Sequence, residues 1–104
     1  MNNIAIHQGD ILKIEKINKP VLVLSKNFFN ETYEIIGCPI YNMGSIGPLH
    51  ISITTDKISG IAHCEKLTLL DLNYRGFTVI DRIKIADIIN ITDAVQSIFD
   101  NWNY

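Results

Sequence analysis

The sequence predicts a small, mainly β protein whose antiparallel sheet curls into a barrel or half-barrel and is closed by a C-terminal helix. Several short segments alternate apolar and polar residues, which is the pattern of strands with one buried face. Apolar residues make up 47% of the 104 residues, and the prominence of β-branched isoleucine among them favours sheet. After Lys84 the apolar residues recur at steps of three and four, which is typical of an amphipathic helix.

The first third of the chain predicts a β-hairpin. Residues 10–17 (DILKIEKI) alternate apolar and polar, which indicates a half-buried strand with its charges outward, and Gly9 and Asp10 form the turn before it. Residues 21–24 (VLVL) are continuously apolar, as in a central strand buried on both faces. Residues 18–20 leave room only for a short link, so the two strands should pair.

The middle of the chain predicts an irregular strand between two connections. Residues 25–32 indicate a turn or a single helical turn, and residues 33–40 a third strand. Gly37 and Pro39 within that strand indicate a bulge or an approach to a sheet edge. Residues 41–48 carry two glycines and a proline, which predicts a mobile loop.

The remaining segments predict further strands and the closing helix. Strands are expected over 49–54, 61–67 and 77–83, and residues 69–72 either continue the second of these or form a separate segment. The helix is expected from about residue 85 to 101, with its apolar stripe packed on the sheet. Repeats and linkers are absent from the sequence, so one domain over residues 1–104 is expected.

Charge and composition narrow the function classes. The formal net charge is −2, which argues against a protein that grips long duplex DNA by neutralising phosphates and leaves room for a short single-stranded contact. Charged residues are 19%, below the roughly 25% of an average domain, which hints at an interface and most simply at a homodimer. The sequence shows neither a secretory signal nor a run of about 20 apolar residues, so no membrane contact is expected.

Two cysteines, Cys38 and Cys64, stand in apolar, strand-like surroundings. Buried free thiols are the expectation for such residues in a cytoplasmic protein, although a disulfide between them is the alternative.

The strongest candidate for chemistry is the step from His63 to Glu65. Residues two apart on a strand share a face, so an imidazole beside a carboxylate would form a general acid and base pair there. Ala62, Cys64 and Lys66 would point the other way. The alternative is a solvated face with a weak ion pair. A metal site is not expected, because the sequence has no HExxH, no CxxC and no clustered aspartates.

The sequence predicts no chemical role for the other two histidines. His50 alternates with the apolar residues of its predicted strand, and His7 precedes the first strand. Both side chains are therefore expected to point to solvent.

An ordered series of short segments resembles the MazF/PemK (Kid-like) toxins of type II toxin–antitoxin pairs. The series is GDI, then KPVLVLS, a loop with Asn30, CPI, GIAHCEKLTLLD…R and a terminal helix, over about residues 9–99. The resemblance implies an SH3-like barrel of the kind shared with CcdB. It also implies a dimeric, metal-independent and cofactor-free endoribonuclease that cuts single-stranded RNA, leaves 2′,3′-cyclic phosphate and 5′-hydroxyl ends, and is inhibited by a cognate antitoxin protein.

The resemblance assigns roles to individual residues. An Arg-x-Asp step of the Kid/PemK branch falls on His63 and Glu65, which makes Glu65 the base and His63 the acid. The catalytic arginine of the MazF branch, before the second strand, falls on Lys19, which keeps the charge but not the planar fork. A family threonine after the P-I step is replaced by Tyr41, whose phenol can bond a phosphate or stack on a base.

Two further features of the resemblance leave alternatives open. Asp71 and Arg75 match a DxxxR pattern, in which Arg75 would reach RNA, while a structural ion pair or turn contact is the simpler interpretation. CcdB, a gyrase poison with the same barrel, contacts its target through C-terminal residues that include a tryptophan, and Trp102 echoes this loosely. A CcdB-like protein-binding toxin and a catalytically silent barrel are therefore the competing functions.

Overall fold

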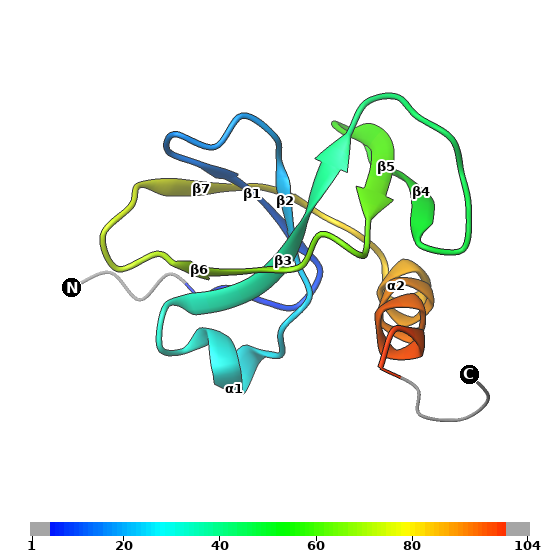
Figure 1. Ribbon diagram of the computed structural model, residues 1–104. Coiled ribbons are helices and arrows are strands. Elements are labelled where there is room, and N and C mark those ends of the chain that lie inside the picture. Colours follow the sequence, from blue (N-terminus) through cyan, green and yellow to red (C-terminus); the bar gives the residue numbers. More distant parts are fainter. Residues whose placement is uncertain (1–4, 100–104) are drawn as a thin grey trace.

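The computed structural model describes residues 5–99 and contains seven strands and two helices (Figure 1). They are β1 (Asp10–Ile14), β2 (Val21–Val23), α1 (Asn27–Asn30), β3 (Glu34–Tyr41), β4 (His50–Thr54), β5 (Ser59–His63), β6 (Thr68–Asp71), β7 (Phe77–Arg82) and α2 (Ile85–Ser97). None of the helices in this range is long and apolar enough to cross a membrane. The prediction about Trp102 lies outside the described residues.

All strand pairs are antiparallel, and the sheet divides at β3. The strand order is β4-β5-β3-β2-β1-β7, with β6 also paired to β3. The first half of β3 pairs with β6, its end pairs with β5, and β2 pairs along its middle. Figure 1 shows the resulting curl, with β4, β5 and α2 on one side and β1, β6 and β7 on the other. The predicted half-barrel with a C-terminal helix is confirmed.

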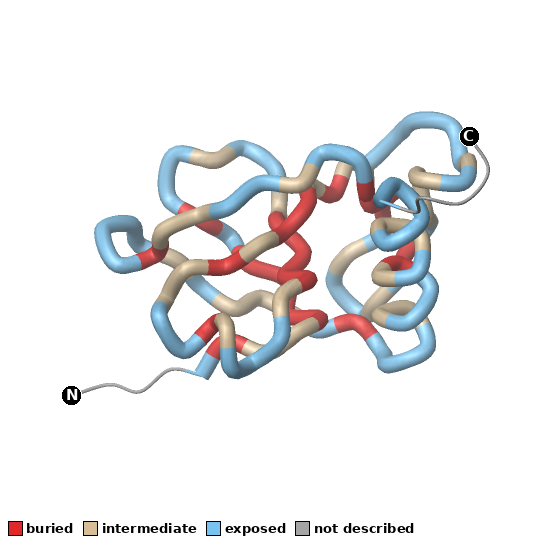
Figure 2. The backbone as a smooth tube through the Cα atoms, turned by 60° about the horizontal axis from the view of Figure 1, so that its bottom comes forward, coloured by how far each residue is buried: buried red, intermediate tan, exposed pale blue. Residues whose placement is uncertain are grey.

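Two apolar clusters fill the two faces of this curled sheet. One gathers around α2 and includes Ile11, Leu22, Cys38, Ile53 and Ile91; the other includes Leu12, Ile14, Val23, Ile35 and Leu72. Figure 2 shows the buried residues along the central strands and the exposed ones in the connections.

The first hairpin forms as predicted, but β1 is buried more completely than its alternation suggests. Leu12 pairs with Val21 across the two strands. Ile11 and Leu12 are both 0% exposed and belong to different clusters, so β1 is covered on both faces and only Lys13 within it is exposed. The half-buried strand predicted over 10–17 is therefore wrong in its burial and ends at Ile14. The curl of the sheet supplies the second covered face.

Gly37 does not mark a bulge or an edge, as the sequence suggested. It lies in the interior of the sheet, opposite Val23 on β2 and Thr68 on β6. A Cβ atom at this position would lie 2.6 Å from the carbonyl oxygen of Leu22, which is too close for any side chain. Glycine is therefore required because β2 passes close to β3 where β3 changes partners from β6 to β5.

The second half of the chain differs from the prediction mainly in where elements end. β5 stops at His63 rather than at residue 67, residues 68–71 form the separate strand β6, and α2 ends at Ser97. Cys38 and Cys64 are buried free thiols, as expected.

A buried carboxylate joins the first and last strands. Asp10, predicted to lie in a turn, is 0% exposed and opens β1. Its Oδ1 accepts a hydrogen bond from Arg82 Nε at 2.7 Å, and its Oδ2 accepts one from the backbone N–H of His7 at 2.8 Å. The His7 ring also lies 3.1 Å from Arg82 Nη2, so it is partly engaged rather than free in solvent.

We expect Arg82→Ala to lower the free energy of unfolding by about 2 kcal/mol, because it leaves the Asp10 carboxylate buried without its counter-ion while Arg82 itself is partly solvated. Urea denaturation followed by circular dichroism measures the change. Lys13→Ala, which removes an exposed cation from β1, is the control and should change stability by less than about 0.5 kcal/mol. Equal stability of the two variants would contradict a structural role for the Asp10–Arg82 pair.

Candidate active site

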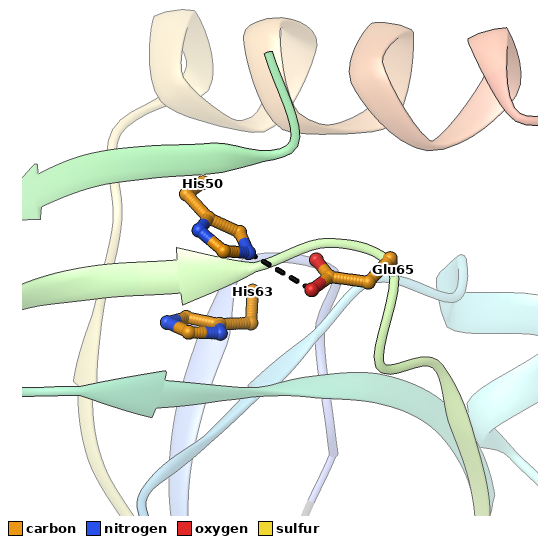
Figure 3. A group of neighbouring side chains, drawn as sticks. All are labelled: His50, His63 and Glu65. Carbon is orange, nitrogen blue, oxygen red and sulfur yellow. Dashed lines mark hydrogen bonds and ion pairs between the residues drawn. The ribbon is translucent and has the colours of Figure 1, made fainter. Parts of the chain in front are cut away.

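The candidate site lies where β4 and β5 run side by side (Figure 3). His50 opens β4, His63 closes β5, and the register pairs the two residues directly. Directly opposed residues on antiparallel strands share a face, and the two imidazoles stack with centroids 4.0 Å apart and an interplanar angle of 23°. The expectation that His50 points freely to solvent is therefore wrong: its side chain is 32% exposed and forms part of the cluster.

Glu65 reaches the cluster through a turn rather than along a strand. The chain turns after His63, whose carbonyl oxygen accepts a hydrogen bond from the backbone N–H of Lys66 at 3.0 Å. The Glu65 carboxylate then lies 2.8 Å from His50 Nε2 (Figure 3). Potential ligand atoms of His50, His63 and Glu65 all lie within 4.8 Å of one another. The predicted residues do come together, but the direct partner of Glu65 is His50.

The His63 ring is held between two other rings. Tyr41, at the end of β3, lies on one side with a centroid distance of 4.1 Å, and His50 lies on the other. Neither His63 ring nitrogen has a hydrogen-bond partner among the described residues, and both are shielded from solvent. Gly44 of the loop between β3 and β4 lies next to His63 Nε2, since a Cβ atom on it would be 4.0 Å away.

Two lysines surround Tyr41. Lys66 Nζ donates a hydrogen bond to the phenol oxygen at 3.0 Å, and Lys19 Nζ lies 5.2 Å from the ring centroid. Lys19 and Tyr41, both predicted from the sequence, are thus brought together beside His63. Cys64 is buried in the core, as expected. The expectation that Lys66 points the same way is wrong, because Lys66 lies beyond the end of β5, where alternation no longer applies.

Two pockets adjoin these residues. One of about 270 Å³ is lined in part by Lys19, Tyr41, Asn42 and Lys57. The other, of about 210 Å³, is mostly apolar and extends from Lys66 over β3. Tyr41 lines the first pocket, and Lys66, the hydrogen-bond partner of Tyr41, lines the second.

Arg75 is not brought to this cluster. It is exposed in the connection between β6 and β7, at the end of the sheet away from β4 and β5 (Figure 1). Asp71 accepts a hydrogen bond from the backbone N–H of Asn73 at 2.9 Å, which is a turn contact, and no ion pair joins it to Arg75 within the described part of the chain.

The surroundings of the two imidazoles shift their pKa values in opposite directions. The hydrogen bond that His50 donates to Glu65 raises the pKa of His50 above its ordinary 6.5, and the same bond lowers the pKa of Glu65 below 4.5. Loss of solvent contact, followed by the nearby His50 charge, lowers the pKa of His63 below 6.5. His50 therefore keeps its proton to higher pH than His63, which is the separation that an acid and a base need.

Comparison with known proteins assigns the chain to a family. The family model described as PemK-like, MazF-like toxin of type II toxin–antitoxin system matches residues 8–99. The chain belongs to this family. No curated protein sequence matches it significantly.

Solved MazF structures share the fold. The MazE–MazF complex of Deinococcus radiodurans aligns with a TM-score of 0.84 at 17% identity, covering 93% of this chain and 98% of that one. MazF alone from the same organism aligns with a TM-score of 0.80 at 16% identity over 93% and 98% of the two chains. An endoribonuclease in complex with its cognate antitoxin from a mycobacterial species gives 0.80 at 15% identity over 96% and 99%. The PemK/MazF fold expected from the sequence is confirmed.

His50, His63 and Glu65 include the ligand types of a catalytic zinc site, so their fit to a metal ion requires a test. A metal lies in the plane of each imidazole that binds it, along the nitrogen lone pair. The His50 and His63 rings are stacked nearly parallel, 4.0 Å apart, so their lone pairs lie in separate planes and do not converge on one point. In this PemK/MazF chain the arrangement fits proton transfer and does not fit a shared metal ion.

Sequence reasoning missed His50, although a signal for it was present. A tight turn after Thr54 pairs Thr54 with Ser59, and counting back along both strands places His50 opposite His63. The contact of Lys66 with Tyr41 had no comparable signal, because it depends on where β5 ends.

We expect Glu65→Gln to lower the pKa of His50, because the substitution removes the negative charge at its Nε2. Titration of the ring-proton resonances by NMR, assigned with a His50→Asn variant, measures the shift. In the unaltered protein the pKa of His63 should lie below that of His50. Glu31→Gln, which removes an exposed carboxylate beyond α1, is the matched control, and an equal His50 pKa in both variants would refute the coupling.

Proposed function

We propose that this chain is the toxin of a type II pair and a metal-independent endoribonuclease that cuts single-stranded RNA. The observation that carries the proposal is the cluster of His50, His63 and Glu65, with two ammonium groups beside it at Tyr41. These are the groups that cleavage by transesterification requires. His63 and Glu65 belong to the acid–base machinery, and Lys19, Lys66 and Tyr41 contact the RNA.

The reaction needs no outside reagent. The ribose 2′-hydroxyl loses its proton and attacks the adjacent phosphorus, the bond from phosphorus to the 5′-oxygen breaks, and that oxygen takes up a proton. The products are a 2′,3′-cyclic phosphate and a 5′-hydroxyl end. Acid and base groups contribute typically 10²–10⁴-fold to such a rate, and the lysines stabilise the negative charge that develops on the phosphate oxygens.

The charge distribution supports a short single-stranded substrate. The chain has a net charge of −2, whereas tight duplex binding usually requires a broad basic surface. Lys19 and Lys66 instead flank one aromatic ring, a combination that suits a phosphate next to an unstacked base.

The proposed partners are a second copy of the chain and a cognate antitoxin, in the cytoplasm where messenger RNA is available. Several of the similar structures are complexes with antitoxins. Large apolar side chains on the surface of this chain, among them Met43 at 76% exposed and Ile85 at 74%, also favour a protein interface.

Incubation of the purified protein with mixed-sequence RNA in EDTA, followed by mapping of the new ends, tests the activity. We expect cleavage that survives the chelator and leaves 5′-hydroxyl ends. His63→Ala and Glu65→Ala should each lose at least about 100-fold in rate, whereas Glu31→Ala, an exposed carboxylate away from the site, should cleave normally.

Two results would overturn the proposed function. One is the absence of RNA cleavage by folded protein, which would favour the competing function, a protein-binding toxin of the CcdB type. The other is cleavage that EDTA abolishes, because the acid–base cluster would then not be sufficient.

A further inference from the structure

We propose that His50 is a catalytic residue of this site: it donates the proton to the leaving 5′-oxygen, His63 takes the proton from the 2′-hydroxyl, and Glu65 positions His50. The inference rests on the proposed ribonuclease function and deepens it. It revises the roles implied by the family resemblance, in which Glu65 is the base and His63 the acid.

Glu65 is poorly placed to act as the base. Its Oε2 already accepts a hydrogen bond from His50 Nε2 at 2.8 Å, and that bond lowers its pKa and hence its basicity. A proton taken up on the other oxygen, Oε1, would cancel the negative charge that holds the imidazole at Oε2. Holding the imidazole is the orienting role that carboxylates have beside catalytic histidines.

His50 has a second N–H that is available for transfer. When the ring is protonated both nitrogens carry hydrogen; Nε2 is held by Glu65, and Nδ1 lies 3.3 Å from the backbone carbonyl oxygen of Ser45. That distance is beyond the ordinary range for N–H···O bonds, about 2.7–3.2 Å. The Nδ1 contact is therefore weak and can be exchanged for a substrate oxygen.

His63 has the properties that a base needs. Its nitrogens are not engaged by any described residue, but they are shielded from solvent. Tyr41 and His50 cover its two faces, so a substrate has to reach the ring at its edge. Gly44 lies next to Nε2, and Ser45 lies next to His50 Nδ1. Gly44 and Ser45 belong to the same exposed loop between β3 and β4, so a shift of this loop on RNA binding would open the edges of both rings.

The stacking suits a displacement in which the two oxygens lie on opposite sides of phosphorus. The His50 and His63 rings occupy nearly parallel planes 4.0 Å apart. One ring edge can therefore address the entering 2′-oxygen and the other the leaving 5′-oxygen. The Tyr41 ring lies against His63, and Lys66 donates a hydrogen bond to its phenol oxygen at 3.0 Å, so this pair can supply positive charge to a phosphate bound at the ring edges.

The charges around the two rings give a defined pH dependence. His50 lies against His63 and the Glu65 carboxylate, with the Cys64 thiol nearby. His63 lies against His50 and the Tyr41 phenol, with Glu65 and Lys66 nearby. The pKa of His50 is raised and that of His63 is lowered. Cleavage should follow a bell-shaped profile, with the acidic limb set by deprotonation of His63 and the alkaline limb by deprotonation of His50.

A pair of matched RNA substrates tests the role of His50. One has the ordinary 5′-oxygen at the cleavage site and the other has sulfur in that bridging position. A thiolate leaves without protonation because a thiol is far more acidic than an alcohol, with a pKa of about 8.5. We expect His50→Gln to lose at least about 100-fold on the oxygen substrate and less than about 10-fold on the sulfur substrate. His63→Gln should lose at least about 100-fold on both.

The positioning role of Glu65 has its own readout. Glu65→Gln should move the alkaline limb of the oxygen-substrate profile to lower pH, because the pKa of His50 falls when the carboxylate is removed. The sulfur substrate should show no alkaline limb in the unaltered protein. If Glu65 had only a structural role, Glu65→Gln would lower the cleavage rate without moving the alkaline limb.

The outcomes separate the inference from the proposed function. If the unaltered protein cleaves neither substrate, both fail. If it cleaves RNA and His50→Gln either cleaves the oxygen substrate normally or loses equally on both substrates, only the proton-donor role is overturned. A second variant, His50→Asn, is measured on the same two substrates, and the stability of both variants is compared by urea denaturation. This comparison detects misfolding of either variant. Retained cleavage of the sulfur substrate also shows that the site is folded.

Discussion

In an antiparallel pair, a slip of one residue moves every side chain to the opposite face, so the register of β4 against β5 decides whether the cluster exists. The observed register places His50 directly opposite His63. A slip of one residue would place His50 opposite Ala62 or Cys64, and His63 opposite Leu49 or Ile51. Gly60 helps to fix β5 against β3, because a Cβ atom on it would lie 2.6 Å from the carbonyl oxygen of Tyr41. The same close approach sets Tyr41 beside the His63 ring.

The change of partners along β3 positions the remaining side chains of the site. β3 leaves β6 and joins β5 near its end, which carries Tyr41 to the face where the two histidines stack. Lys19, in the β1–β2 connection, and Lys66, in the turn after β5, then meet at this ring from different parts of the chain. A protein with a net negative charge thereby acquires a local cationic surface.

The His50–Glu65 pair has a larger effect on proton affinity than on stability, because exposed ion pairs contribute little to folding. Folding raises the pKa of His50, so its contribution is complete below about 6.5 and is lost as the pH rises through the folded value. Folding lowers the pKa of Glu65, so its contribution is complete above about 4.5 and is lost on acidification. The pair stabilises most between these two values, where both groups are charged.

Periodicity in the sequence was sufficient to predict the half-barrel, the first hairpin and the C-terminal helix, because alternation and helical spacing are local properties. The sequence also predicted that His63 and Glu65 lie together, but the structure brings Glu65 there through a turn after β5. Only the tertiary structure decided the partner of Glu65, the contact of Lys66 with Tyr41, and the bond between Asp10 and Arg82. Alternation holds only as far as a strand continues, and the end of β5 at His63 left no local signal. Asp10 and Arg82 are 72 residues apart, so only the folding of β7 against β1 brings these charges together.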